Sequence, residues 1–136
     1  MCGVTGIVRF RGSFDAEMLQ KMSDAIAHRG PDDEGYFVQD AEGGNFQCKG
    51  PDSHPDFGLL PDIRDLYEGD IIAGIAHRRF SILDISSRGH QPWRPNDESF
   101  ALTFNGEIYN YLELRQELVH LGYGPFTSNS DTEVLG

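Results

Sequence analysis

The chain has 136 residues, 38% of them hydrophobic, and a formal net charge of −11, which is typical of one globular domain of ordinary size. This acidity argues against a nucleic-acid partner, because phosphates require a basic surface, and it disfavours anionic membranes. No run of about 18 apolar residues and no secretory signal pattern is present, so we expect a cytoplasmic protein without a membrane partner. The five histidines lack ligand-like spacing, so we expect no metal site.

The chain begins Met1-Cys2-Gly3. Removal of Met1 would leave Cys2 with a free α-amine beside its own thiol. The reference pKa values, about 7.7–8.0 for the amine and about 8.5 for the thiol, place a proton acceptor and a nucleophile near neutrality in one residue. This arrangement is typical of N-terminal-nucleophile enzymes. The alternatives are an ordinary cysteine near a chain end or a disulfide to Cys48, which a reducing compartment disfavours.

The first half of the chain predicts a strand, a helix and a second strand. Apolar and β-branched residues predict the first strand over 3–10, and a turn follows at 11–13. Ser13 or Asp15 is expected to cap a helix that runs to about Ala27. Its core-facing side is expected to carry four residues at helical spacing: Met18, Leu19, Met22 and Ile26. Gly and Pro predict a loop over 28–35, before a strand at 36–38.

Residues 40–70 are rich in Gly, Pro and Asp, and predict a long surface excursion with one helical turn near 63–67. The apolar run at 71–76 predicts a strand that is buried on both faces. Arg78 and Arg79 follow this strand directly. Such arginines are either a solvated strand end or a clamp for a carboxylate, which a fixed guanidinium can hold in bidentate fashion.

The last third predicts one strand and two helices. A strand is expected over 99–104, before Asn105-Gly106, a pair that forms either a hairpin turn or the amide and N–H of an oxyanion hole. Asn110 opens a helix with a capping box to Glu113, and Gly122 ends it. Another capping box at 130–133 begins a further helix. The first of these helices is expected to bury four residues: Tyr111, Leu114, Leu118 and Leu121.

Five stretches stand together in one order. They are Met-Cys-Gly at 1–3, His-Arg-Gly-Pro-Asp-Asp-Glu-Gly at 28–35, His-Arg-Arg-Phe-Ser-Ile-Leu-Asp at 77–84, Asn-Gly-Glu-Ile-Tyr-Asn at 105–110 and Ser-Asp-Thr-Glu-Val at 130–134. This set, with Gly-His-Gln-Pro at 89–92, resembles the N-terminal glutaminase domain of class II glutamine amidotransferases, in the form found in glutamine-hydrolysing asparagine synthetases. The resemblance covers 1–136 except roughly 39–70, which looks like a surface insertion. It implies an α+β fold, the four-layer αββα sandwich of N-terminal-nucleophile hydrolases.

The resemblance also implies a role for each matching position. Cys2 matches the nucleophile, with its own α-amine as the general base. Arg79 matches the partner of the glutamine α-carboxylate, and the main chain of Phe80, Ser81, Ile82 and Leu83 matches the segment along the substrate. Asn105 and Gly106 match the oxyanion hole, and Glu107 and Asp131 match the acidic groups at the α-ammonium end.

The implied function is hydrolysis of L-glutamine to glutamate and ammonia through a cysteinyl thioester. This reaction needs no cofactor, whereas ATP and Mg are expected in a synthetase domain, in cis or in trans, that these residues do not include. We therefore expect the glutaminase domain to be incomplete at its C-terminus, and the full-length form to be a homodimer. The alternatives are a non-catalytic regulatory or interaction domain of the same fold, or an amidotransferase with a different acceptor.

Overall fold

The computed structural model describes residues 1–81 and 86–136. They contain one antiparallel sheet of four strands in the order β1-β4-β2-β3. The strands are β1 (Gly3–Val8), β2 (Asp33–Asp40), β3 (Asn45–Cys48) and β4 (Ile71–Arg79). The α+β class is confirmed. The second sheet of a four-layer sandwich is absent from the described residues.

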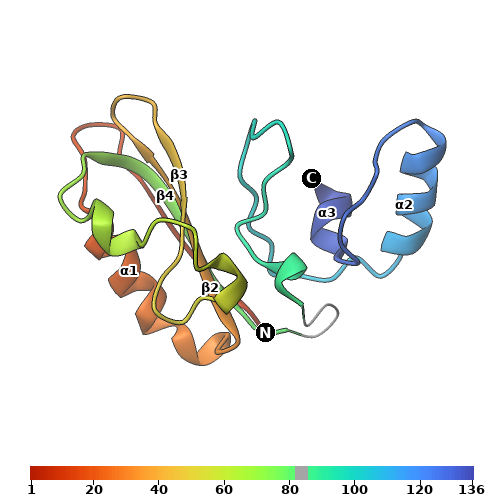
Figure 1. The fold of residues 1–136 in the computed structure, drawn as a ribbon, viewed down its shortest axis with the longest axis horizontal. Helices are drawn as coiled ribbons and strands as arrows, with labels where there is room; N and C mark the ends of the chain where they lie inside the picture. Colours follow the sequence, from red (N-terminus) through yellow and green to blue (C-terminus); the bar gives the residue numbers. More distant parts are fainter. Residues whose placement is uncertain (82–85) are drawn as a thin grey trace.

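In the part of the chain that the structure describes, three α-helices accompany the sheet: α1 (Ala16–Ala25), α2 (Tyr111–His120) and α3 (Asp131–Leu135). Figure 1 shows the sheet and α1 at one end of the molecule and α2 and α3 at the other. Short 3-10 turns occur at 27–29, 55–57, 63–66 and 87–89. Among the helices of the described residues, none has the length and apolarity that crossing a bilayer requires.

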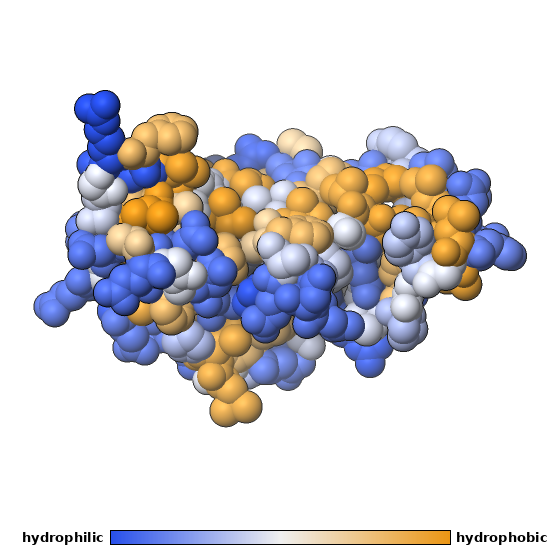
Figure 2. Space-filling model, turned by 90° about the horizontal axis from the view of Figure 1, so that it is seen from above, coloured by the Kyte–Doolittle hydropathy of each residue, from blue (hydrophilic) through white to orange (hydrophobic). Residues whose placement is uncertain are grey.

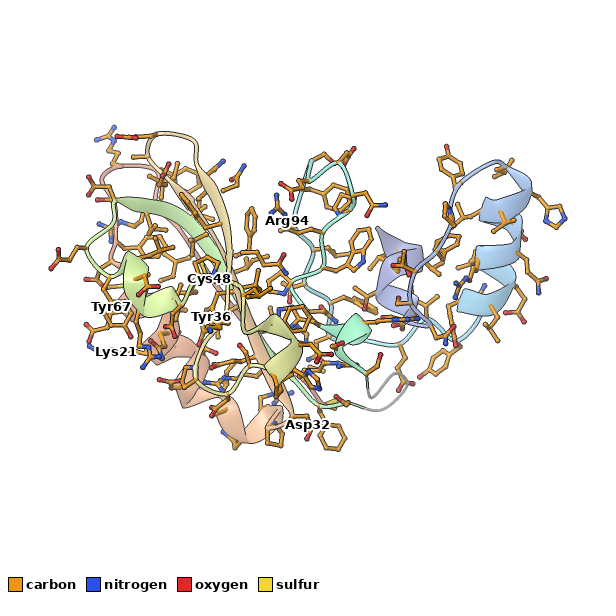
Figure 3. All side chains as sticks on the ribbon, in the orientation of Figure 1. Lys21, Asp32, Tyr36, Cys48, Tyr67 and Arg94 are labelled. Atoms are coloured by element: carbon orange, nitrogen blue, oxygen red, sulfur yellow. The ribbon has the colours of Figure 1, made fainter. Side chains whose placement is uncertain are left out.

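The first predicted helix is confirmed, but its buried face differs from the expectation. Asp15 caps α1, because its side chain accepts a hydrogen bond from the N–H of Met18. The buried residues are Ala16, Leu19, Gln20 and Ser23. Met18 is 45% exposed, so the predicted methionine face is wrong there. The core between α1 and the sheet consists of Phe14, Ala16, Leu19, Tyr36, Val38, Cys48, Ile63, Ile71 and Ala76, and Figure 3 labels Tyr36 and Cys48 within it.

The loop predicted over 28–35 is too long. Strand β2 begins at Asp33, since Asp33, Glu34 and Gly35 already pair with the last three residues of β4. Strand β4 accordingly continues past its apolar run to Arg79. Backbone pairing with the central strand therefore overrides the turn signal of these polar residues.

The excursion predicted over 40–70 is not confined to the surface. Residues 45–48 form β3, which pairs with β2, and the predicted helical turn is present at 63–66. Cys48 and Ile63 are fully buried. Because residues 40–70 show no hydrophobic periodicity, the sequence did not predict the four-residue strand β3 or the burial of Cys48 and Ile63.

The C-terminal third is more irregular than its sequence predicts. The strand expected over 99–104 is reduced to one antiparallel bridge between Trp93 and Leu102. Asn110 makes no side-chain cap, and α2 has no buried residue, although Gly122 ends it with a φ of 91°. Figure 2 shows hydrophobic surface at this end of the molecule, where Leu112, Val119 and Leu121 are exposed.

Candidate active site

One pocket of about 410 Å³ unites residues from five separate segments of the chain. Its walls come from the N-terminus, the end of β4, Gly89 and Gln91, the segment 104–109 and the start of α3. Among the lining residues are seven that the sequence predicts for the site: Cys2, Arg79, Phe80, Asn105, Gly106, Glu107 and Asp131. Ser81 does not line it, and its N–H instead donates to the Asp32 carboxylate at 2.8 Å. Ile82 and Leu83 lie outside the described residues.

Cys2 is held where β1 begins. The N–H of Phe80 donates a hydrogen bond to its Sγ at 3.3 Å, and Nε of Arg29 donates to its carbonyl oxygen at 3.1 Å. Met1 also lines the pocket, and it is 77% exposed. Hydrogen bonds therefore fix both the backbone and the sulfur of Cys2. Met1, whose removal would free the α-amine of Cys2, lies at the surface.

Arg79 turns its guanidinium to the pocket wall in a fixed orientation. Its side chain is almost buried, and Nη1 donates to the carbonyl oxygen of Ser86 at 2.8 Å. Gly89 packs directly against the guanidinium, and a Cβ atom at that position would overlap Nη2. A cation fixed in this way suits a carboxylate that enters the pocket.

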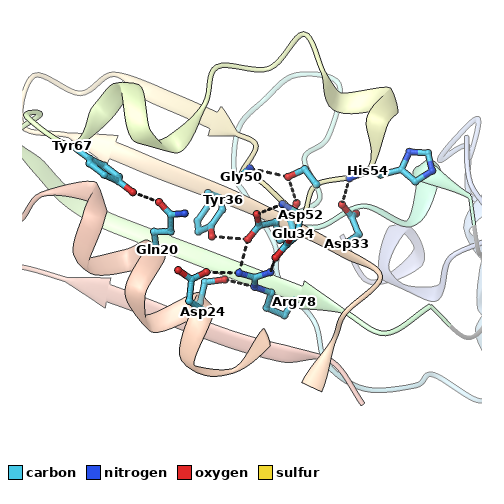
Figure 4. A network of polar contacts seen from close by, with 12 residues as sticks. Gln20, Asp24, Asp33, Glu34, Tyr36, Gly50, Asp52, His54, Tyr67 and Arg78 are labelled. Atoms are coloured by element: carbon cyan, nitrogen blue, oxygen red, sulfur yellow. Dashed lines mark hydrogen bonds and ion pairs between the residues drawn. The ribbon is translucent and has the colours of Figure 1, made fainter. Parts of the chain in front are cut away.

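The neighbouring Arg78 has a structural role. Its fully buried guanidinium pairs with Glu34 at 2.8 Å, with Asp52 at 2.7 Å and with Asp24 at 2.5 Å (Figure 4). Nε also donates to Ser23 Oγ at 2.8 Å. Burial raises the pKa of the Glu34 carboxyl, although the Arg78 charge opposes that rise. Arg78 thus links α1, β2 and the loop at 52, and it does not line the pocket.

The oxyanion-hole candidates lie in a segment with no regular secondary structure. Asn105, Gly106 and Glu107 are exposed at the pocket. Asp131 Oδ2 accepts the N–H of Ile108 at 2.9 Å, which connects this segment to the start of α3. Of the two alternatives for Asn105-Gly106, the hairpin turn is excluded, because no strand follows Gly106.

Two buried histidines connect residues 90–103 to the sheet, and no spacing pattern in the sequence identifies them. His90 Nδ1 lies 2.7 Å from the Asp33 carboxylate, and the Phe57 ring stacks on its imidazole at 3.8 Å. His77 Nδ1 lies 2.8 Å from Thr103 Oγ1, and burial lowers the pKa of His77 to about 4. Within residues 1–81 and 86–136, no cluster of three or more His, Cys, Asp or Glu side chains could hold a metal ion.

Known proteins resemble this chain over most of its length. The family model described as glutamine amidotransferase domain matches residues 1–45 and 60–136. Asparagine synthetase (glutamine-hydrolyzing) 1 of Bacillus subtilis is 37% identical over 139 residues, covering 99% of this chain and 17% of that protein. Asparagine synthetase (glutamine-hydrolyzing) 2 of the same organism is 34% identical over 140 residues, covering 99% of this chain and 14% of that protein. The chain therefore spans less than a quarter of these curated relatives.

Proposed function

Since the chain belongs to the glutamine amidotransferase domain family, we propose that its pocket hydrolyses L-glutamine to glutamate and ammonia. We further propose that the ammonia passes to an ATP- and Mg-dependent synthetase domain, in cis or in trans, of a cytoplasmic asparagine-synthetase-like protein. A synthetase domain would account for the remaining length of the curated relatives, of which this chain covers only a small part. We also propose that the full-length protein is a homodimer.

The observation that carries the proposal is the meeting of Cys2, Arg79 and Asn105 at one pocket, although they stand far apart in the sequence. Glutamine is zwitterionic at its α-carbon. In the proposed pose Arg79 pairs with the α-carboxylate, and Glu107 and Asp131 attract the α-ammonium. The main chain from Phe80 toward Leu83 runs along the substrate, and the side-chain amide is directed at the thiol.

The proposed reaction is acyl transfer through sulfur. The α-amine of Cys2 takes the thiol proton, Sγ attacks the side-chain carbonyl carbon, and the Asn105 amide and Gly106 N–H stabilise the oxyanion. The amine then gives the proton to the leaving nitrogen, so that the C–N bond breaks and ammonia departs. Water attacks the resulting γ-glutamyl thioester, its proton returns through the amine to the sulfur, and glutamate leaves.

The four-layer αββα sandwich is part of the same proposal. It is supported by the position of α1, which packs against β1 and β4 in the way an outer helical layer would. The second sheet would then come from residues that these 136 do not include. A structure of the full-length protein tests this arrangement, and a glutaminase domain with only one sheet would contradict it.

The experiment that tests the activity is Cys2→Ala in the full-length protein with a processed N-terminus. We expect glutamate release from glutamine to be abolished, whereas synthesis from added ammonia persists because it does not use this pocket. Cys2→Ser is expected to be nearly as inactive, since a hydroxyl is a far weaker nucleophile at neutral pH. Glutamine hydrolysis by the Cys2→Ala protein would refute the assignment.

A non-catalytic domain of the same fold is the second candidate, and the state of the N-terminus distinguishes it from the glutaminase. Met1 lines the pocket, and while it is attached the α-nitrogen of Cys2 is an amide that accepts no proton. Mass spectrometry of the N-terminus of the natural protein separates the two. A terminal Cys2 is required for catalysis, and a retained Met1 assigns the domain a regulatory or interaction role. An amidotransferase with another acceptor would hydrolyse glutamine without amidating aspartate.

A further inference from the structure

Gln91 connects the rigid sheet to the irregular segment that carries Asn105 and Gly106. Its side chain is 8% exposed. Oε1 accepts the N–H of Phe104 at 2.6 Å, and Nε2 donates to the carbonyl oxygen of Phe104 at 3.2 Å. We propose that Gln91 is a positioning residue of the glutaminase reaction, one that sets the geometry of the oxyanion hole. This inference rests on the proposed function.

The two bonds act as a substitute for strand pairing. A side-chain amide that both accepts from and donates to one residue occupies both of its main-chain groups, as an antiparallel partner does. Residues 103–110 belong to no strand or helix, and the bridge at Leu102 ends before them. The amide of Gln91 therefore fixes the peptide groups on either side of Phe104, directly ahead of Asn105.

Gln91 is itself held by the sheet. Its main-chain oxygen packs against β2 so closely that a Cβ atom at Gly35 would overlap it. The next residue, Pro92, accepts a hydrogen bond from Gln47 of β3 at 3.1 Å. Contacts with β2 and β3, rather than with the surface loops, therefore set the position of the oxyanion hole.

A third bond extends the same support to the far wall of the pocket. Nε2 of Gln91 also donates to Thr132 Oγ1 at 3.2 Å, and Thr132 directly follows Asp131 in α3. One amide thereby fixes the distance between the oxyanion hole and the proposed ammonium ligand. Oxyanion donors act only within a narrow distance of the developing charge, so a small displacement lowers the rate of the chemical step.

The test is Gln91→Leu in the full-length protein with a processed N-terminus. Leucine has a similar size but no hydrogen-bonding group. We expect kcat for glutamine hydrolysis, per folded molecule, to fall roughly 10- to 100-fold, because the hole acts chiefly in the transition state. KM should stay within about threefold, since Arg79 still binds the α-carboxylate. An unchanged kcat, or a rise in KM alone, would overturn the inference.

Two further variants separate positioning from simple destabilisation. Gln20→Leu is the matched control, because Gln20 is as buried as Gln91 but bonds to Tyr67 and does not line the pocket, so the variant should leave kcat per folded molecule unchanged. Gln91→Glu retains an acceptor for the Phe104 N–H but loses the donor to its carbonyl oxygen, so its kcat should lie between those of wild type and Gln91→Leu. If Gln91→Leu fails to fold, Gln91→Glu carries the test, and a wild-type kcat for Gln91→Glu would then contradict the inference.

A double-mutant cycle identifies the residue through which Gln91 acts. In an Asn105→Ala background the hole has already lost its side-chain donor, so adding Gln91→Leu should cost less than its effect in the wild type. If the double variant loses kcat by the product of the two single losses, Gln91 acts elsewhere and the proposal is overturned. If the wild type shows no Cys2-dependent hydrolysis at all, the proposed function fails instead, which keeps the two failures distinct.

Discussion

The main-chain N–H of Phe80 donates a hydrogen bond to Sγ of Cys2 at 3.3 Å, across a sequence separation of 78 residues. The relationship follows from strand pairing. Gly3 of β1 lies opposite Arg78 of β4 in the antiparallel register, so the end of β4 is delivered beside the start of the chain. The candidate nucleophile and the candidate carboxylate ligand, Arg79, therefore share one edge of the sheet.

Removal of that N–H should slow glutamine hydrolysis. Phe80→Pro eliminates the donor, and the loss of one such hydrogen bond, worth about 0.5–1.5 kcal/mol, predicts a fall in kcat of roughly 2- to 10-fold. Phe80→Ala keeps the donor, and because the Phe80 ring is 43% exposed it should cost little stability. Steady-state kinetics of both variants check the prediction, and equal losses in kcat would show that the ring, not the N–H, matters.

The two adjacent arginines should respond differently to substitution. Arg79→Ala removes a charge-assisted contact of about 1.5–3 kcal/mol and should raise KM for glutamine roughly 10- to 100-fold. Arg78→Ala leaves Glu34 buried without its guanidinium and should instead lower the free energy of unfolding by about 3–5 kcal/mol. Glutamine kinetics and urea unfolding of both proteins distinguish the roles. A larger KM effect for a folded Arg78→Ala protein would reverse the assignment.

Gly89 provides a subtler test of Arg79. In Gly89→Ala the new methyl group would overlap Nη2, the far end of a flexible side chain, so the guanidinium should move while the fold persists. We expect a rise in KM for glutamine with little change in thermal stability. The matched control is Gly30→Ala, where the methyl group would overlap the backbone of Arg78 and Arg79 and should cost stability. A Gly89→Ala protein with an unchanged KM would show that the orientation of Arg79 is unimportant.

His77 should make stability depend on pH. Burial lowers the pKa of His77 from about 6.5 to about 4. Between these two pH values the His77 imidazole is protonated in the unfolded chain but neutral in the folded chain. The free energy of unfolding should therefore fall as pH drops from about 6.5 to about 4, by on the order of 3 kcal/mol. Stability should return as pH rises toward neutrality.

The variant that isolates this effect is His77→Asn. An asparagine amide does not titrate in this range, and it can still bond to Thr103 Oγ1, which lies 2.8 Å from His77 Nδ1. Urea unfolding of both proteins between pH 4 and 7 should show a smaller acid loss for the variant. Equal losses would assign the acid sensitivity to other groups.

The sequence predicted most of the elements whose signals are local. Strand β1, helix α1 with its Asp15 cap and the apolar part of β4 all follow from propensity and periodicity. The first residues of β2 were missed, because Asp33, Glu34 and Gly35 read as a turn and become a strand only by pairing with β4. The strand expected over 99–104 is not formed, for the converse reason: within residues 1–81 and 86–136, no partner strand meets it beyond the bridge at Leu102.

The candidate site was predictable as a set of residue types but not as a geometry. Cys2, Arg79 and Asn105 are recognised by their motifs, and the pocket contains all three. What positions them could not be read from the chain. Arg78 and Arg79 look alike in sequence, and only burial assigns Arg78 to the fold. The two bonds from Gln91 to Phe104 depend on tertiary contacts with β2 and β3, which no local pattern encodes.

The most direct test of the account is the covalent intermediate on Cys2. The full-length protein with a processed N-terminus is mixed with glutamine, quenched in acid within the turnover time, digested and analysed by mass spectrometry. We predict a γ-glutamyl group on the N-terminal peptide, attached to Cys2 and absent when Cys2 is replaced by Ala. Glutamine turnover with an unmodified Cys2, or with the acyl group on Cys48 instead, would contradict the assignment of Cys2 as the nucleophile.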